Sequence, residues 1–222
     1  MDVPTRMEAE AFMAEAESMN PGPWVEHSLY VARAAEAIAE NHPSLDPEAA
    51  FIVGYLHDIG RRVGITDTRH LIDGYIFLRE QDFDDAARIC ITHSFPIKDI
   101  RSVAGKWDCS KAEISFVKEY IAGIEFDDYD RLIQLCDAVA LPTGFCLLEK
   151  RLMDVALRYG TNEYSVPRWK AYLSLKEEFE KDIGQSIYSV LPGVVENTFG
   201  FNTQDQMVRE QRGRCSPAPT DI

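Results

Sequence analysis

The amino-acid sequence predicts a single all-α domain, built as a helical bundle. Three observations lead to this prediction: apolar residues recur at helical spacing, the apolar runs are of helix length, and no segment shows the alternation of a half-buried strand. The chain has 222 residues, of which 45% are hydrophobic and 27% charged, as in ordinary globular proteins. We expect this domain over residues 1–201, with a core at 24–145, and a loosely ordered polar tail over 202–222.

Turn and cap signals delimit the first three helices. The segment NPGP at 20–23 ends a polar first helix, and HPS at 42–44 breaks the second. Asp46 and Pro47 then supply an N-cap and a first-turn proline. The third helix that follows is apolar almost all round and is therefore expected at the centre of the domain, with Gly60 as its stop.

The rest of the chain also alternates helices with short turns. Residues 61–67 are expected to form a loop, and Asp127 opens a later helix that stops at Leu141-Pro142. No internal repeat or low-complexity linker interrupts this pattern. The expected helices cover residues 6–19, 24–40, 47–60, 68–80, 83–93, 110–122, 127–141, 145–159, 166–183 and, as a short one, 185–191.

The charge balance limits the possible partners. With 37 acidic against 23 basic residues the formal net charge is -14, and no basic stripe compensates for it. Nucleic-acid polymers and anionic membrane surfaces are thus not expected as partners. The five cysteines are scattered and form no C-x-x-C pair. Because no export signal or membrane-spanning run is seen, we expect a cytoplasmic location.

The residues that indicate chemistry are His57 and Asp58, at the end of the most apolar helix. An imidazole beside a carboxylate is costly to bury unpaired, and a divalent metal ion removes that cost. Asp137 lies among apolar neighbours of another predicted helix, and His27 stands near the start of a third. The alternative is a helix-end histidine bonded to the backbone, with Asp58 paired to Arg61 or its neighbour.

The order His27, then HDIG at 57–60, then Asp137 resembles the HD-domain superfamily of metal-dependent phosphohydrolases. In that family, four ligands in the order His, His-Asp, Asp lie in a helical core. His70, with a glycine four residues later, and His93, at the end of an apolar run, resemble the extra histidines of members that hold two metals. The resemblance covers residues 24–145 and implies one or two divalent ions, with Asp58 bridging them. A set of His and Asp ligands without thiolate suits Mn, Fe, Mg, Co or Ni.

This resemblance implies hydrolysis of a small phosphate ester or nucleotide through a metal-activated water, with Asp58 as the catalytic residue. Four cations follow the ligands in sequence and are expected to bind the phosphorylated substrate. The chain has no GYP motif, so a cyclic-dinucleotide phosphodiesterase is not expected. The candidate substrate-binding cations are Arg61, Arg62, Arg69 and Lys98.

Two other functions remain open from the sequence. Some dinuclear HD proteins have the same ligand order but use two iron ions to activate O₂ and cleave a C–H or C–C bond of a small polyol or phosphonate. The second alternative is a metal-stabilised helical module that only binds a ligand or partner. Ligand spacing does not separate the oxygenase from the hydrolase, and fold-level analogy favours the hydrolase.

Overall fold

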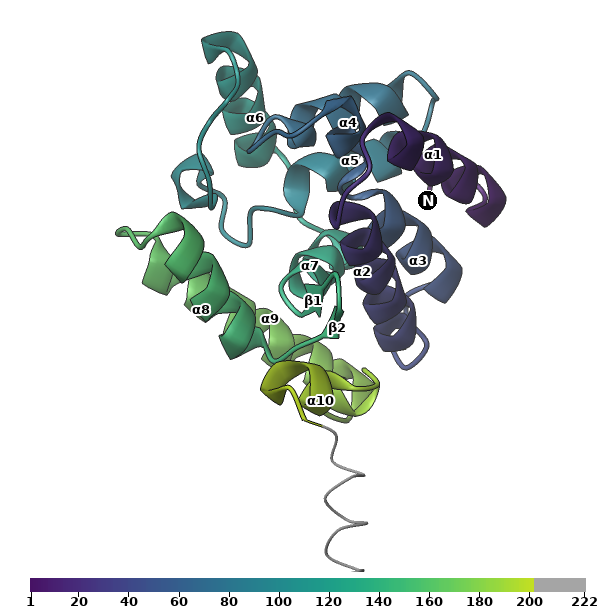
Figure 1. The fold of residues 1–222 in the computed structure, drawn as a ribbon, viewed down its shortest axis with the longest axis vertical. Coiled ribbons are helices and arrows are strands. Elements are labelled where there is room, and N and C mark those ends of the chain that lie inside the picture. Colours follow the sequence, from purple (N-terminus) through teal and green to yellow (C-terminus); the bar gives the residue numbers. More distant parts are fainter. Residues whose placement is uncertain (202–222) are drawn as a thin grey trace, which may run out of the picture.

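A computed structural model of the chain describes residues 1–201, and within them the all-α prediction is confirmed. Ten α-helices and three short 3₁₀ helices are joined by brief turns, and two-residue strands form one antiparallel pair (Figure 1). The elements are α1 (Arg6–Met19), α2 (Trp24–Ala39), α3 (Pro47–Leu56), η1 (Ile59–Val63), α4 (His70–Arg79), α5 (Asp84–Thr92), η2 (Ile100–Ser102), α6 (Lys111–Gly123), α7 (Asp128–Asp137), β1 (Ala140–Leu141), β2 (Gly144–Phe145), α8 (Leu148–Tyr159), α9 (Ser165–Ile183), η3 (Ile187–Ser189) and α10 (Val194–Phe199).

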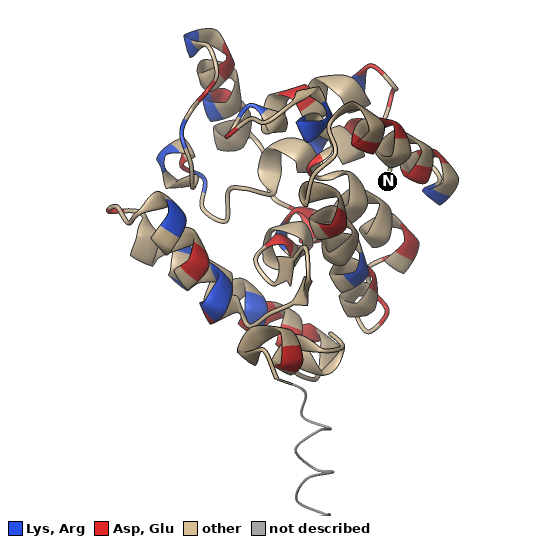
Figure 2. Cartoon of the chain, in the orientation of Figure 1, with Lys and Arg blue, Asp and Glu red and all other residues tan. Residues whose placement is uncertain are grey.

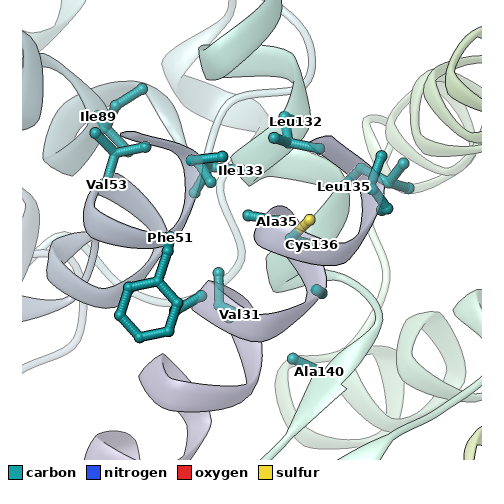
Figure 3. Packing of buried hydrophobic residues seen from close by; sticks show 14 of the residues in the cluster. Val31, Ala35, Phe51, Val53, Ile89, Leu132, Ile133, Leu135, Cys136 and Ala140 are labelled. Atoms are coloured by element: carbon teal, nitrogen blue, oxygen red, sulfur yellow. The ribbon is translucent and has the colours of Figure 1, made fainter. Parts of the chain in front are cut away.

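The main core lies between α2, α3, α5 and α7 (Figure 3). The apolar helix α3 is central, as predicted, and residues such as Phe51 and Val53 on it are buried. Helices α2 and α3 approach closely at Gly54, where an added Cβ would lie 2.9 Å from the Cα of Ala32. Because α7 packs on both helices, its last residue is held beside the end of α3.

Some predicted boundaries were wrong. The helix expected over 47–60 ends at Leu56, and a 3₁₀ helix begins at Ile59 and continues to Val63, into the region expected as a loop. The helix expected over 127–141 ends at Asp137, because the chain then pairs β1 with β2 and the Cys146 amide donates to Val139 O at 2.9 Å. The strand pair and α10 were not predicted, and the helix expected at 185–191 is the shorter η3.

Helices α8 to α10 lie together at one end of the molecule (Figure 1). Helix α9 packs on α7, and α10 packs on β2, so this C-terminal part covers the core helices on that side. None of the helices within residues 1–201 has both the length and the apolar character needed to cross a membrane. The tail expected at 202–222 lies outside the described residues.

Candidate metal centre

The six predicted ligands come from the ends of five helices, and the fold brings these ends together. The sequence folds this way because each of these residues sits where a helix with a buried apolar face stops or starts. The buried helix ends therefore place polar groups beside one another. Five of the six residues are buried, and the sixth, Asp137 on α7, has a side chain that is 23% exposed. The ligands are His27 in the first turn of α2, His57 and Asp58 after α3, His70 at the start of α4, His93 after α5, and Asp137 at the end of α7.

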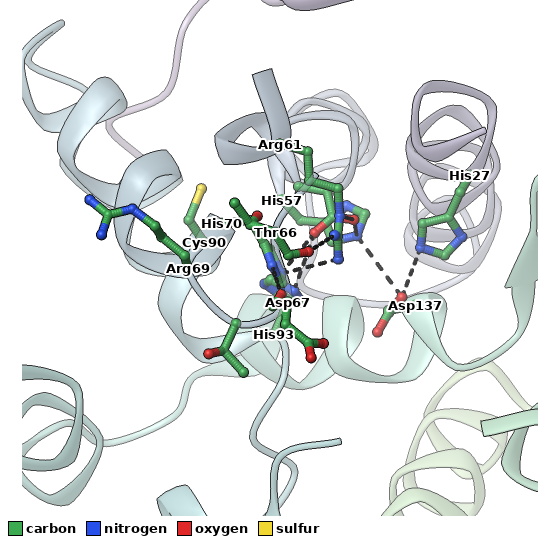
Figure 4. A network of polar contacts seen from close by, with 12 residues as sticks. His27, His57, Arg61, Thr66, Asp67, Arg69, His70, Cys90, His93 and Asp137 are labelled. Atoms are coloured by element: carbon green, nitrogen blue, oxygen red, sulfur yellow. Dashed lines mark hydrogen bonds and ion pairs between the residues drawn. The ribbon is translucent and has the colours of Figure 1, made fainter. Parts of the chain in front are cut away.

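The ligand atoms form two groups that share one carboxylate (Figure 4). In the first group, donor atoms of His27, His57 and Asp58 lie within 4.8 Å of one another, and in the second group those of Asp58, His70 and His93 do so. Asp58 Oδ1 lies 3.1 Å from His70 Nε2 and 3.8 Å from His93 Nε2, whereas Asp58 Oδ2 lies 3.9 Å from His57 Nε2. The two oxygens of Asp58 therefore face different histidines.

Asp137 completes the first group. Its Oδ1 lies 2.8 Å from His27 Nε2 and 4.0 Å from His57 Nε2, and Figure 4 shows it at the His27 side of the cluster. The Asp137 carboxylate therefore points to the two histidines and not only to bulk water. Side chains from α2 and α7 thus meet those at the end of α3 on this side of the cluster.

The backbone sets the orientation of three imidazoles. The Nδ1 atoms of His57, His70 and His93 lie 2.7, 2.6 and 3.1 Å from backbone carbonyl oxygens three or four residues earlier. A carbonyl only accepts, so each Nδ1 carries the proton and each Nε2 presents its lone pair to the cluster. This is the arrangement in which histidines bind metal ions, with the second nitrogen held by a backbone acceptor.

The electrostatics also favour the metal-binding protonation state. Burial lowers the pKa of His57 to about 4 and, together with Arg61, lowers that of His70 to about 3. Burial opposes ionisation of Asp58, but Arg61 and the nearby histidines outweigh it and hold its pKa well below the ordinary value. Burial also opposes ionisation of Asp137, but the hydrogen bond from His27 and the nearby positive groups, Arg151 among them, together outweigh it and lower its pKa. At neutral pH, His57 and His70 are therefore neutral and both carboxylates are ionised.

One buried atom tests whether a metal ion fits. Asp58 Oδ1 is buried and has no hydrogen-bond partner among the described residues. Its nearest neighbour, His70 Nε2, carries a lone pair and not a proton, so two acceptors face each other at 3.1 Å. Arg61 offsets part of this repulsion, since its guanidinium lies 3.5 Å from His70 Nε2, but it leaves Asp58 Oδ1 unpartnered. A cation between the two acceptors would remove the remaining cost. The residues therefore fit a divalent metal ion.

Comparison with known proteins agrees with this geometry. A family model described as HD domain matches residues 24–141, more than half of the chain. The chain belongs to the HD-domain family. No curated protein and no solved structure matches it. HD domains are commonly metal-dependent hydrolases, and the six ligands lie within the matched residues.

Of the four cations expected to bind substrate, only Arg61 lies at this HD-domain centre. Its Nε donates to Asp58 Oδ2 at 2.6 Å, so the arginine pairing considered as an alternative for Asp58 is present in the structure. Figure 4 shows Arg69 directed away from the cluster. The other three cations pair with acidic residues: Arg62 with Glu15 at 2.7 Å, Arg69 with Asp73 at 3.3 Å, and Lys98 with Glu125 at 3.0 Å.

A cavity of about 310 Å³ opens onto the ligands of the HD domain. Its walls include Arg61 from the HD core and, from the C-terminal helices, residues that the sequence analysis did not select. A signal for two of them exists: Arg151 and Arg158 are seven residues apart in a predicted helix and so share one face with Val155. The unselected lining residues include Arg151, Arg158, Arg168 and Tyr172.

Proposed function

We propose that this HD-domain protein is a metal-dependent phosphohydrolase that acts on a small phosphate ester or nucleotide. The observation that supports it most directly is Asp58, a buried carboxylate shared by two histidine groups, with one oxygen unpartnered. The cavity beside it, of about 310 Å³, suits a small substrate, and arginines in its wall suit phosphate. A polymer such as nucleic acid fits neither this volume nor the charge of -14.

The residues divide into two ligand sets. His27, His57, Asp58 and Asp137 would hold one divalent ion, and Asp58 with His70 and His93 would hold a second. Mn, Fe, Mg, Co or Ni suits such donors. When bound, the ions would neutralise phosphoryl charge and supply an activated water. The protein's part is to keep His57 and His70 neutral through burial, to keep Asp58 ionised through Arg61 and the nearby histidines, and to orient three imidazoles through the backbone acceptors.

Arg61 is the cation best placed to bind the phosphoryl group. Its guanidinium donates to Asp58 Oδ2 and to Thr66 O, and it lines the cavity. Because guanidinium and carboxylate are matched in geometry, Arg61 neutralises Asp58 in the metal-free protein. Once a metal ion takes over that carboxylate, the same guanidinium can bind a phosphate oxygen at the ligand end of the cavity.

The proposal is tested by metal analysis of protein purified without chelator, followed by anaerobic phosphate-release assays on nucleotides and sugar phosphates. We expect about two metal equivalents per chain, about one in His70→Ala and His93→Ala, and phosphate release that is lost in His57→Ala. His42→Ala is the matched control, because His42 packs on Phe179 outside the cluster and should change neither quantity.

Each alternative predicts a different result. The oxygenase would release no phosphate without O₂ and would consume O₂ on a polyol or phosphonate, with iron near two per chain. The binding module would turn over no ester, with or without O₂, and His57→Ala would leave ligand binding intact. Either result would replace the phosphohydrolase proposal.

A further inference from the structure

The C-terminal wall of the cavity contains three arginines without acidic partners. Of the twelve arginines in residues 1–201, eight lie within 4.0 Å of a carboxylate oxygen; Arg33, Arg151, Arg158 and Arg168 do not. Three of these four line the cavity. In a chain with 37 acidic and 23 basic residues, this concentration of unpaired positive charge is unusual. Figure 2 shows the basic positions along α8.

Arg168 is the most informative of the three, because it is buried. It is 8% exposed, and its side chain donates to Ser102 O at 2.6 Å, which anchors α9 to η2. That single bond to a neutral carbonyl leaves the charge uncompensated. A buried cation without an anion is costly, so its retention in a cavity wall points to an anionic ligand.

The other two arginines extend this positive surface along α8. Arg151 makes no side-chain hydrogen bond or ion pair with the described residues, and Arg158 only approaches Asp154 O at 3.4 Å and stacks on Tyr159. Both guanidinium groups are thus free to bind a ligand. The same cavity is lined by His27 and Asp137, so one small molecule can reach both the metal ligands and these arginines.

We infer that Arg151, Arg158 and Arg168 form a second anion-binding subsite, so that the substrate carries a further anionic group, a phosphate or a carboxylate, besides the ester phosphate at the metal ligands. This inference rests on the proposed function for the role of the first phosphate. The cavity lining contains four arginines against three aspartates, so its formal charge is positive although the net charge of the chain is -14.

Phosphonates test the subsite without turnover, since their C–P bond is not a substrate for ester hydrolysis. Calorimetry would compare alkylphosphonates with α,ω-bisphosphonates and ω-phosphonocarboxylates of two, four and six carbons, on metal-loaded and on chelator-treated protein under anaerobic conditions. We expect at least one chain length of the bisphosphonates or phosphonocarboxylates, which carry a second anionic group, to bind about 10- to 100-fold more tightly than the matched alkylphosphonate. The series that gains more identifies the second group as phosphate or carboxylate.

Variants locate the effect. Arg151→Gln and Arg158→Gln should both bring the ratio close to one, and Arg158→Gln should leave alkylphosphonate affinity unchanged. Lys150→Gln is the matched control on the same helix, because Lys150 pairs with Asp154 and does not line the cavity; it should retain the full ratio. Arg168→Gln should also bring the ratio close to one. Its circular dichroism must be native for this comparison, since Arg168 also anchors η2.

The outcomes separate the subsite from the hydrolase. The subsite is refuted if the probes with one and with two anionic groups bind equally at all three lengths. It is also refuted if the ratio is unchanged in Arg151→Gln and Arg158→Gln. Both results would hold even if phosphate esters are hydrolysed. A ratio that depends on these arginines, in a protein that hydrolyses no ester, would support the subsite and reject only the proposed reaction.

Discussion

Gly60, the last residue of the HDIG segment, is required by close packing and not by a turn. An added Cβ would lie 2.0 Å from His70 O and 2.4 Å from Gly74 N, so η1 and α4 touch backbone to backbone. A Cβ added at Gly74 would in turn lie 2.9 Å from Cys90 Sγ. This contact places His70 beside Asp58, which lies two residues before Gly60. The close contact at the two glycines therefore sets the distance between Asp58 and His70.

Gly60→Ala should destabilise the protein by about 3 kcal/mol or more, because the methyl group meets backbone that cannot move independently of α4. The measurement is urea unfolding of chelator-treated protein, so that lost metal binding does not add to the effect. Gly123→Ala is the control: a Cβ there meets nothing within 4 Å, and its free energy of unfolding should change by less than about 1 kcal/mol. Equal stability of the two variants would contradict this account of Gly60.

Single residues also show what the sequence could and could not predict. The six candidate ligands could be selected because a buried His-Asp pair is chemically conspicuous and because their order resembles a family pattern. Arg61, Arg62, Arg69 and Lys98 looked equivalent, since all follow ligands in the chain, yet only Arg61 turns to the cavity. Side-chain direction depends on acidic partners from distant elements, such as Glu15 for Arg62, and no local pattern reveals it.

At the scale of elements, a buried polar network fixes α5 against α7. Asp130 of α7 is fully buried and forms an ion pair with Arg88 of α5, and its carboxylate accepts a hydrogen bond from Thr92 Oγ1 at 2.6 Å. From the next turn of α7, Gln134 Nε2 donates to Thr92 O at 3.0 Å. Because Thr92 precedes His93, and α7 ends in Asp137, this network positions one ligand of each metal group.

Asp130→Ala should lower the free energy of unfolding by about 3 kcal/mol, since it leaves Arg88 and Thr92 without their shared acceptor. We also expect weaker metal binding, measured by competition with a chromophoric chelator, because the end of α5 loses its anchor. Asp128→Ala removes an exposed carboxylate two residues earlier and should change either quantity little. The account fails if Asp130→Ala matches Asp128→Ala in both measurements.

The boundaries of elements were predicted well where local signals decide them. Caps and prolines place the starts of α1, α3, α6 and α7 within one or two residues. The ends of α3 and α7 were expected four residues too late, since apolar periodicity continues past Leu56 and Asp137 although the chain leaves the helix. In both cases tertiary contacts take over, through the packing of η1 on α4 and the pairing of β1 with β2.

At the scale of the whole molecule, the site is assembled from two regions that the sequence treats differently. The HD core, over 24–141, supplies every candidate metal ligand, and these residues follow the order of a family pattern. The C-terminal helices supply the opposing charge in Arg151 and Arg168, and their approach to the core depends on packing of α9 on α7. The fold class and the residues that meet in the His/Asp cluster were thus predictable from sequence, whereas the composition of the cavity wall required the assembled structure.

Acidification should destabilise the metal-free protein before its carboxylates titrate. Burial depresses the pKa of His57 from 6.5 to about 4 and that of His70 from 6.5 to about 3, so below pH 6.5 the unfolded chain binds protons that the folded chain does not. Stability is therefore complete above pH 6.5 and falls as the pH is lowered toward the folded pKa values. By pH 5 the loss should reach about 2 kcal/mol for each histidine.

Urea unfolding of chelator-treated protein at pH 7.5, 6 and 5 measures this slope. His70→Asn, whose amide does not titrate in this range, should show a shallower slope than the wild type, because only His57 then contributes. Since metal ions bind the neutral imidazoles, the metal-loaded protein should lose its ions over the same pH range, detected by dialysis and metal analysis. A free energy of unfolding that is constant from pH 7.5 to 5 would contradict the assignment of His57 and His70 as neutral, buried groups aimed at the cluster.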